Sequence, residues 1–166
     1  MLTKNLLALA LLFTTASVFA ETTPGFDAAK QKFAKSDKSE AARSAYVGAL
    51  ADLLHHEVSE HMLHGGHDAQ VLAIDAELKK YPAPKDSDSK ALTKLRVGHW
   101  QSPRHTYIFR DNGTWRFAPE DDSTSGTWQI KGNQYFESDR PYTILVANPK
   151  YFIYTDGQAV FFEYRL

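Results

Sequence analysis

The sequence predicts an α+β protein in which an N-terminal helical hairpin packs on a C-terminal antiparallel meander of six to seven strands. Residue usage changes near position 95. Residues 26–81 are rich in Ala, Lys, Glu and Leu and contain no proline, which favours helices. Residues 97–166 hold all three tryptophans, six of the eight tyrosines and six of the ten phenylalanines, and such residues favour strands. Between the two parts, the stretch YPAPKDSDSK, residues 81–90, extends neither pattern.

The first twenty residues, MLTKNLLALALLFTTASVFA, have the pattern of a secretory signal peptide. Lys4 supplies the positive n-region, Leu6–Phe13 forms a short apolar run, and Ala20 is a small residue suited to cleavage before Glu21. The apolar run is too short to span a membrane comfortably, and no later stretch is apolar enough. We therefore expect removal of residues 1–20, a periplasmic or secreted location and no integral membrane span after cleavage.

Length, charge and cysteine content narrow the class of protein further. Cleavage would leave 146 of the 166 residues, enough for one compact core, and losing Lys4 would change the net charge from −1 to about −2. A nearly neutral chain argues against nucleic-acid binding. The chain has no cysteine, which excludes disulfides and thiolate sites and fits an exported bacterial protein. The expected division is a signal peptide at 1–20, a helical region at 21–81, a linker at 82–95 and an antiparallel β domain at 96–166.

Residues 36–66 carry the strongest helical pattern. Ser36 or Ser39 can cap the start of this helix, and Gly65 with Gly66 can end it in a left-handed conformation. Its apolar residues recur at i, i+4, i+7 and i+8, as on one face of an amphipathic helix. These residues are Tyr46, Leu50, Leu53 and Leu54.

Two shorter helices are expected on either side of the long one. The first lies around Phe26–Phe33, and the second follows Asp68, which can cap it, and stops before Pro82. The second carries four apolar residues, Val71, Leu72, Ile74 and Leu78. The long helix and the one after it would form an antiparallel hairpin. Because short helices rarely persist alone in water, these helices should pack on each other or on the β part.

The β part contains short strands separated by turn residues. The stretch HTYIFRDNGTWRFA, residues 105–118, predicts a hairpin that turns at Asp111–Gly113, and TWQIKGNQYF predicts a second that turns at Gly132–Asn133. A polar loop, PEDDSTSG, lies between these hairpins. Three further strands are expected in YTILVA, YFIYT and AVFFEYRL, which NPK and DGQ separate.

The strands differ in how many of their faces are apolar. In TWRFA, Trp115 and Phe117 alternate with polar residues, so one face of this strand should be exposed to solvent. We expect Trp100, Trp115 and Trp128 to be buried on one side of the sheet. YTILVA and AVFFEY are apolar on both faces and need a second cover. That cover could be the helical hairpin, a dimer partner or a bound apolar ligand.

Three matches, Gly98–Trp100, Asn112–Trp115 and Gly126–Asn133, carry a family resemblance. A Gly-x-Trp that opens the sheet, followed by repeated Gly-Thr-Trp hairpins, resembles the small lipocalin-like meander domains of exported bacterial proteins. The resemblance covers residues 97–166. It implies a ligand-holding barrel and no catalytic residues. Because the segment is short for eight long strands, we expect a partly open barrel filled by its own side chains.

The stretch LLHHEVSEHMLHGGHD, residues 53–68, holds five of the seven histidines. On a helix, Glu57, His61 and His64 at i, i+4 and i+7 share one face and prolong the apolar stripe. With His67 or Asp68 as a fourth ligand, they form a candidate site for zinc or another divalent ion. The stretch contains neither of the usual zinc-enzyme helix motifs, H-E-x-x-H and H-x-x-E-H.

Two other interpretations of the histidines need no metal. The apolar stripe can simply end in a hydrated helix terminus, where positive imidazoles complement the helix dipole. The cluster can also form a pH-responsive contact. The sequence favours the hydrated helix end and therefore no cofactor, with Zn²⁺ as the alternative.

The sequence as a whole favours an exported, non-enzymatic binding or interaction module. Its partner would be a small apolar ligand or another protein. One alternative is a periplasmic protein that handles divalent metal through the histidines. A second alternative is a hydrolase that uses Ser102 and His105, but no motif supplies an orienting acid or an oxyanion hole for such a pair.

Overall fold

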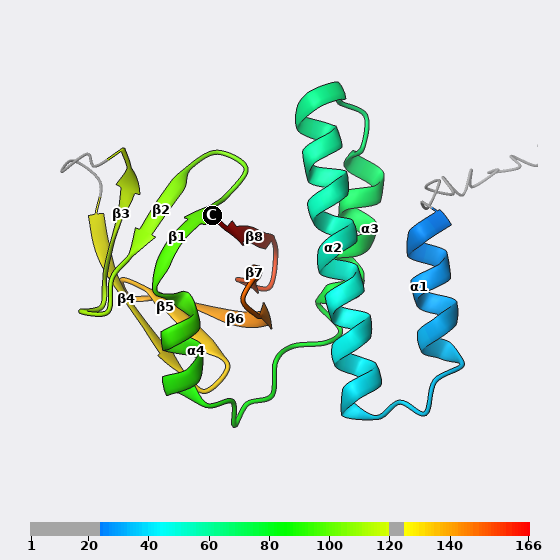
Figure 1. The fold of residues 1–166 in the computed structure, drawn as a ribbon, viewed down its shortest axis with the longest axis horizontal. Helices are drawn as coiled ribbons and strands as arrows, with labels where there is room; N and C mark the ends of the chain where they lie inside the picture. The colour runs from blue at the N-terminus through cyan, green and yellow to red at the C-terminus, as the bar shows by residue number, and fades with distance from the viewer. Residues whose placement is uncertain (1–23, 120–124) are drawn as a thin grey trace, which may run out of the picture.

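The computed structural model describes residues 24–119 and 125–166 (Figure 1). The predicted signal peptide and most of the polar loop at 119–126 lie outside the described residues, so export remains a prediction. The described chain forms four helices followed by eight strands, which confirms the α+β class. None of the helices in this part of the chain combines the length and apolarity that crossing a membrane requires.

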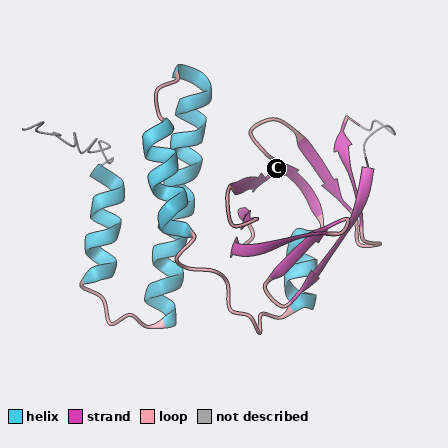
Figure 2. Ribbon diagram, turned by 180° about the vertical axis from the view of Figure 1, so that it is seen from behind, coloured by secondary structure: helices cyan, strands magenta, loops and turns pink. Residues whose placement is uncertain are grey.

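Three helices form a layer on one side of the β-barrel (Figures 1 and 2). They are α1 (Pro24–Ala34), α2 (Glu40–His64) and α3 (Asp68–Leu78). The predicted helical hairpin is formed by α2 and α3, and α1 packs beside α2. The fourth helix, α4 (Ser89–Arg96), lies apart from this layer at one end of the barrel.

The ends of α2 follow the predicted capping residues. The Ser39 hydroxyl accepts a hydrogen bond of 3.2 Å from the backbone N–H of Ala42, and Gly65 ends the helix with φ 73°. Asp68 was expected to cap α3, but it is the first helical residue, and His67 occupies the cap position without a side-chain hydrogen bond. Asp68 instead lies 3.5 Å from the imidazole of His61.

Eight antiparallel strands close into a barrel in chain order, so the expectation of six to seven strands in a partly open barrel is wrong. The strands are β1 (Gly98–Gln101), β2 (Thr106–Phe109), β3 (Thr114–Ala118), β4 (Ser125–Lys131), β5 (Gln134–Glu137), β6 (Arg140–Ala147), β7 (Tyr151–Thr155) and β8 (Val160–Arg165). The four-residue strand β1 makes the difference, because it pairs with both β2 and β8. The architecture agrees with a lipocalin-like barrel.

The barrel closes narrowly between its first and last strands. Only two residue pairs join β1 to β8, Trp100 with Arg165 and Gln101 with Tyr164. The earlier residues of β8, Val160–Glu163, pair with β7 alone. Among the described residues, no strand pairs with the other side of this part of β8, so one edge of β8 is open there.

Two hydrophobic clusters lie on opposite faces of the later strands. Alternate residues of β7 show the division, because Phe152 and Tyr154 join the barrel interior while Tyr151 and Ile153 join the cluster under the helices. The helices contribute Leu50, Leu54, Ile74 and Leu78 to this outer cluster. The second cover of the doubly apolar strands is therefore the helical layer.

The tryptophans are buried as predicted. Trp100, Trp115 and Trp128 are 0%, 8% and 4% exposed and belong to the barrel cluster. A ring of this size contributes several kcal/mol when a core buries it, on the order of 3 to 5 kcal/mol by truncation to Ala. Aromatic residues thus fill much of this small barrel.

The segment expected as a linker, residues 82–95, contains all of α4 except its last residue and is attached to the barrel. Asp88 caps α4 by accepting from the backbone N–H groups of Lys90 and Ala91. The backbone N–H of Gly132 donates to the Ser89 hydroxyl over 2.6 Å, so the β4–β5 turn binds the start of the helix. The placement of α4 brings its last residue, Arg96, into the barrel interior, where it is fully buried.

Candidate ligand-binding site

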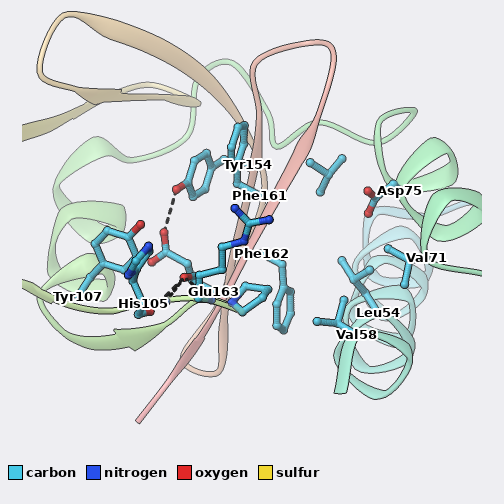
Figure 3. Close-up of a pocket in the computed structure, with 14 residues that line it drawn as sticks. Leu54, Val58, Val71, Asp75, His105, Tyr107, Tyr154, Phe161, Phe162 and Glu163 are labelled. Carbon is cyan, nitrogen blue, oxygen red and sulfur yellow. Dashed lines mark hydrogen bonds between the residues drawn. The ribbon is translucent and has the colours of Figure 1, made fainter. Parts of the chain in front are cut away.

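A cavity of about 470 Å³ lies along the open edge of β8. Its walls come from α2 and α3, from the β1–β2 connection at Ser102–His105, and from Val160–Glu163 of β8. Figure 3 shows Tyr107, Tyr154 and Glu163 on the barrel side of β8, and Leu54, Val71 and Asp75 on the helix side. The cavity thus connects the barrel interior with the space under the helices.

The cavity walls are mainly apolar. Aliphatic and aromatic side chains surround it from both sides: Leu54, Val58, Val71, Val160, Phe161 and Phe162. Pro103, the tyrosines Tyr107 and Tyr154, and five more polar residues complete the lining: Asp75, Ser102, Arg104, His105 and Glu163. A volume of a few hundred cubic ångströms with few polar groups is typical of sites for small molecules.

Glu163 lies where the cavity meets the barrel interior, and it is paired. Arg96 donates two hydrogen bonds to its carboxylate, of 2.6 and 3.0 Å, and the Tyr154 hydroxyl donates a third of 2.8 Å. Both charged residues are almost completely buried. Burial opposes the charge of Arg96, but the adjacent Glu163 carboxylate outweighs it and raises the pKa of Arg96. The pair therefore persists as an ion pair.

Aromatic rings surround the guanidinium of Arg96. Its central carbon lies 3.6 Å from the ring centroid of Phe109 and 4.2 Å from that of Phe152. The indole N–H of Trp100 donates to the Arg96 carbonyl over 2.7 Å, which fixes the end of α4. Stacking of a cation on ring faces offsets part of its lost hydration, which explains how the barrel holds an arginine.

The tyrosines near this pair stay protonated hydroxyls. Burial raises the pKa of Tyr154 well above its ordinary value, and burial, with a further contribution from Glu163, raises the pKa of Tyr107 to about 12. Burial and then the Glu163 charge also raise the pKa of Glu137, which lies 3.4 Å from the Tyr135 hydroxyl. The hydroxyls of Tyr107 and Tyr154, which line the cavity, can exchange hydrogen bonds with a ligand without changing charge near neutral pH.

Asp75 on α3 differs from Glu163 because its carboxylate has no partner. In the described part of the chain, it forms no hydrogen bond or ion pair, and burial raises its pKa from the ordinary 3.8 to about 6. Lys79, one turn along, lowers this pKa in part, but its ammonium donates to the Gln158 carbonyl. Asp75 is thus the uncompensated acid of the cavity.

The structure pairs two of the four residues of the candidate metal site, Glu57 and His67, and places His61 and His64 beside other carboxylates. Glu57, 3% exposed, lies 2.7 Å from His67 Nδ1, whereas His61 lies nearest Asp68 at 3.5 Å, and His64 nearest Glu60 at 3.7 Å. Across residues 24–119 and 125–166, no three His, Asp or Glu side chains gather in a group that could hold a metal ion. The zinc site remains a hypothesis that only metal binding can test.

Ser102 and His105 fold the β1–β2 connection. The Ser102 hydroxyl donates to the His105 carbonyl over 3.0 Å and accepts from the His105 backbone N–H over 3.0 Å. The His105 imidazole stacks on Phe117, with centroids 4.5 Å apart. The serine hydroxyl is therefore engaged with the backbone, and the structure gives no hydrogen bond between it and the imidazole.

Sequence reasoning missed Asp75, Arg96 and Glu163 as site residues. One feature of the sequence could have pointed to Glu163, because it is the single acid between aromatic residues in the stretch FFEY. Asp75 and Arg96 sit in helices where charged residues are ordinary, and only the fold shows that Arg96 is buried and that Asp75 is half-buried in the wall of a cavity.

Comparisons with protein-family models, with curated proteins and with solved structures found no significant match to this chain. The assignment of function therefore depends on the cavity itself.

Proposed function

We propose that this protein is an exported, lipocalin-like binding module that holds a small, mainly apolar ligand in the cavity beside β8. The observation that carries the proposal is the mainly apolar cavity of about 470 Å³ beside β8, where this strand of the barrel pairs on one side only. Barrel mouths and boundaries between structural layers are common places for ligand sites. The predicted signal peptide supports export of the module.

The state of the polar groups favours binding over catalysis. A serine nucleophile needs a hydrogen-bonded base that activates it, and a catalytic acid or base must be able to reach the proton that it transfers. In the cavity, Glu163 is paired with Arg96, and the Ser102 hydroxyl is bound to the backbone. The lining thus offers shape, apolar surface and a few oriented polar groups, which are the requirements of a binding site.

Blocking the cavity tests this proposal. The neutral apolar dye Nile red should bind the purified protein with a saturable rise in fluorescence. Val71→Trp places a large ring in the cavity and should weaken dye binding at least tenfold. Leu72→Trp is the matched control, because Leu72 is the next residue of α3 and is 66% exposed. It should leave binding within about twofold of the wild type.

Two results would contradict the proposal. One is wild-type protein that shows no saturable dye binding. The other is equal loss of binding in both variants, which would place the dye on the outer surface of the helices.

A further inference from the structure

We infer that the natural ligand is a cationic amphiphile, an apolar body bearing one protonated amine, and that Asp75 binds the amine. This inference rests on the proposed function, because it specifies the ligand of the same cavity. It starts from an unpaired carboxylate in an apolar site, which is destabilising unless something supplies a positive charge.

Within the described residues Asp75 forms no ion pair or hydrogen bond, and Lys79 offsets its charge only in part. It lines the cavity beside Val71 on α3, and Figure 3 shows it on the helix side with Leu54 and Val58. The nearest cation on its own helix, Lys79, donates its ammonium to the Gln158 carbonyl. A ligand ammonium in the cavity would complete the pair and also donate hydrogen bonds to the carboxylate.

The other charged residues of the cavity do not compete for this role. Glu163 already accepts two hydrogen bonds from Arg96 and one from Tyr154. Arg104 and His105 line the cavity from the β1–β2 connection, but both residues are exposed, so water screens their charges. Asp75 is therefore the partly buried acid of the cavity that has no partner of its own and is free to pair with a bound cation.

The aromatic walls fit the same ligand. Phe161 and Phe162 of β8 line the cavity, and aromatic ring faces attract ammonium groups as well as apolar chains. An anionic head group would meet two carboxylates, Asp75 and Glu163, of which only Glu163 is neutralised. The charges in the lining thus disfavour fatty acids.

Calorimetric titration with three ligands that share one tail tests this inference. Decylamine, 1-decanol and decanoate have ten carbons each and differ chiefly in the head group; at pH 7.5 the amine and the carboxylate are used below their micelle concentrations and the alcohol below its solubility limit. Wild-type protein should bind decylamine at least tenfold more tightly than decanol, and decanoate more weakly than decanol. Asp75→Asn should remove the preference for the amine and change decanol affinity less than threefold.

Asp68→Asn is the matched control, since it removes one acid from the same helix at a side chain that is 80% exposed. It should keep the full preference for decylamine. A preference that survives Asp75→Asn would overturn the inference, as would a wild-type preference for decanol or decanoate.

The pH dependence of wild-type protein provides an arm that needs no Asp75 variant. Decylamine stays protonated from pH 5 to 8. If the protein loses its preference for decylamine over decanol below pH 6, the cause is therefore protonation of a group on the protein. The charged or titratable groups around the cavity are Asp75, Lys79, Arg104, His105, Tyr107, Tyr154 and Glu163. His105→Gln should keep the same pH dependence, and its loss there would assign the effect to His105 and overturn the role of Asp75.

The outcomes separate this inference from the proposed function. Saturable decanol binding without a preference for decylamine would overturn only the inference about the amine. Failure of all three ligands to bind would overturn the binding function as well.

Discussion

Arg96, the last residue of α4, donates two hydrogen bonds to Glu163 of β8 inside the barrel, across 67 positions of sequence. The two side chains are 0% and 2% exposed. This pair ties the helix at the end of the barrel to the strand whose open edge borders the cavity. It thereby fixes both the closure of the fold and one wall of the candidate site.

Removing one partner of this pair should be costly, because the other charge stays buried. Arg96→Met should lower the free energy of unfolding by about 3 to 5 kcal/mol in urea titration. The double variant Arg96→Met/Glu163→Leu should lose clearly less than the single variant, since it leaves no unpaired charge. Equal losses in the two proteins would show that packing of Arg96, and not its charge, dominates.

Two tryptophans provide a matched test of an indole hydrogen bond. The Trp128 N–H donates to the carbonyls of Thr114 and Arg110, at 3.0 and 3.2 Å, whereas the Trp115 N–H is buried without a hydrogen-bond partner in the described chain. Trp128→Phe should therefore destabilise the protein by about 1 kcal/mol more than Trp115→Phe. Thermal unfolding of both variants measures the difference, and a larger loss in Trp115→Phe would refute this account.

Asp75 should lower stability at neutral pH. Its pKa is about 6 in the folded protein and near 3.8 when exposed, so the folded state holds a proton that the unfolded chain has released. Stability should therefore fall as pH rises from about 4 to 6. Asp75→Asn should raise the free energy of unfolding by roughly 1 to 3 kcal/mol at pH 8 and by little below pH 4. A destabilising effect of this substitution at pH 8 would contradict the uncompensated state of Asp75.

The pair between Glu57 and His67 should stabilise the end of the α2–α3 hairpin. His67→Ala would leave the buried Glu57 carboxylate without its 2.7 Å partner and should lower stability by about 1 to 3 kcal/mol. His64→Ala is the control, because its contact with Glu60 is long and His64 is 69% exposed; its effect should stay below about 0.5 kcal/mol. Similar effects of the two substitutions in chemical denaturation would argue against a specific role for the buried pair.

The metal hypothesis for the same histidines is tested by zinc calorimetry. Because Glu57, His61 and His64 contact three different partners, we expect no saturable zinc binding tighter than the millimolar range. Stoichiometric binding that disappears in His61→Ala/His64→Ala would instead establish the metal site.

Local residue patterns predicted those parts of the fold that local chemistry determines. Ser39 and Gly65 placed the ends of α2, and the turns at Gly113 and Gly132 placed two hairpins, because both glycines adopt positive φ. The aromatic content of residues 97–166 predicted buried tryptophans. The strand that the sequence did not reveal is β1. It has four residues and is recognisable only through its pairing with β2 and β8.

The candidate site could not be predicted in the same way, because its residues are distant in sequence. A helical wheel placed Glu57, His61 and His64 on one face. The fold of the hairpin pairs Glu57 with His67 and brings Asp68 near His61, whereas His64 lies near Glu60 of its own helix. Asp75 and Glu163 line the same cavity only because the fold brings α3 close to β8. Burial of a charged residue depends on such tertiary packing and leaves no local periodicity.

The most direct test of the central claim is amide chemical-shift mapping by nuclear magnetic resonance during titration with 1-decanol. Ligand in the cavity should shift the amides of Val71, Asp75, Ser102, Arg104, His105 and Val160–Glu163, and leave those of the exposed Met62 and Leu63 nearly unchanged. Shifts confined to Met62 and Leu63, or no saturable shifts in the cavity residues, would contradict a binding site at the open edge of β8.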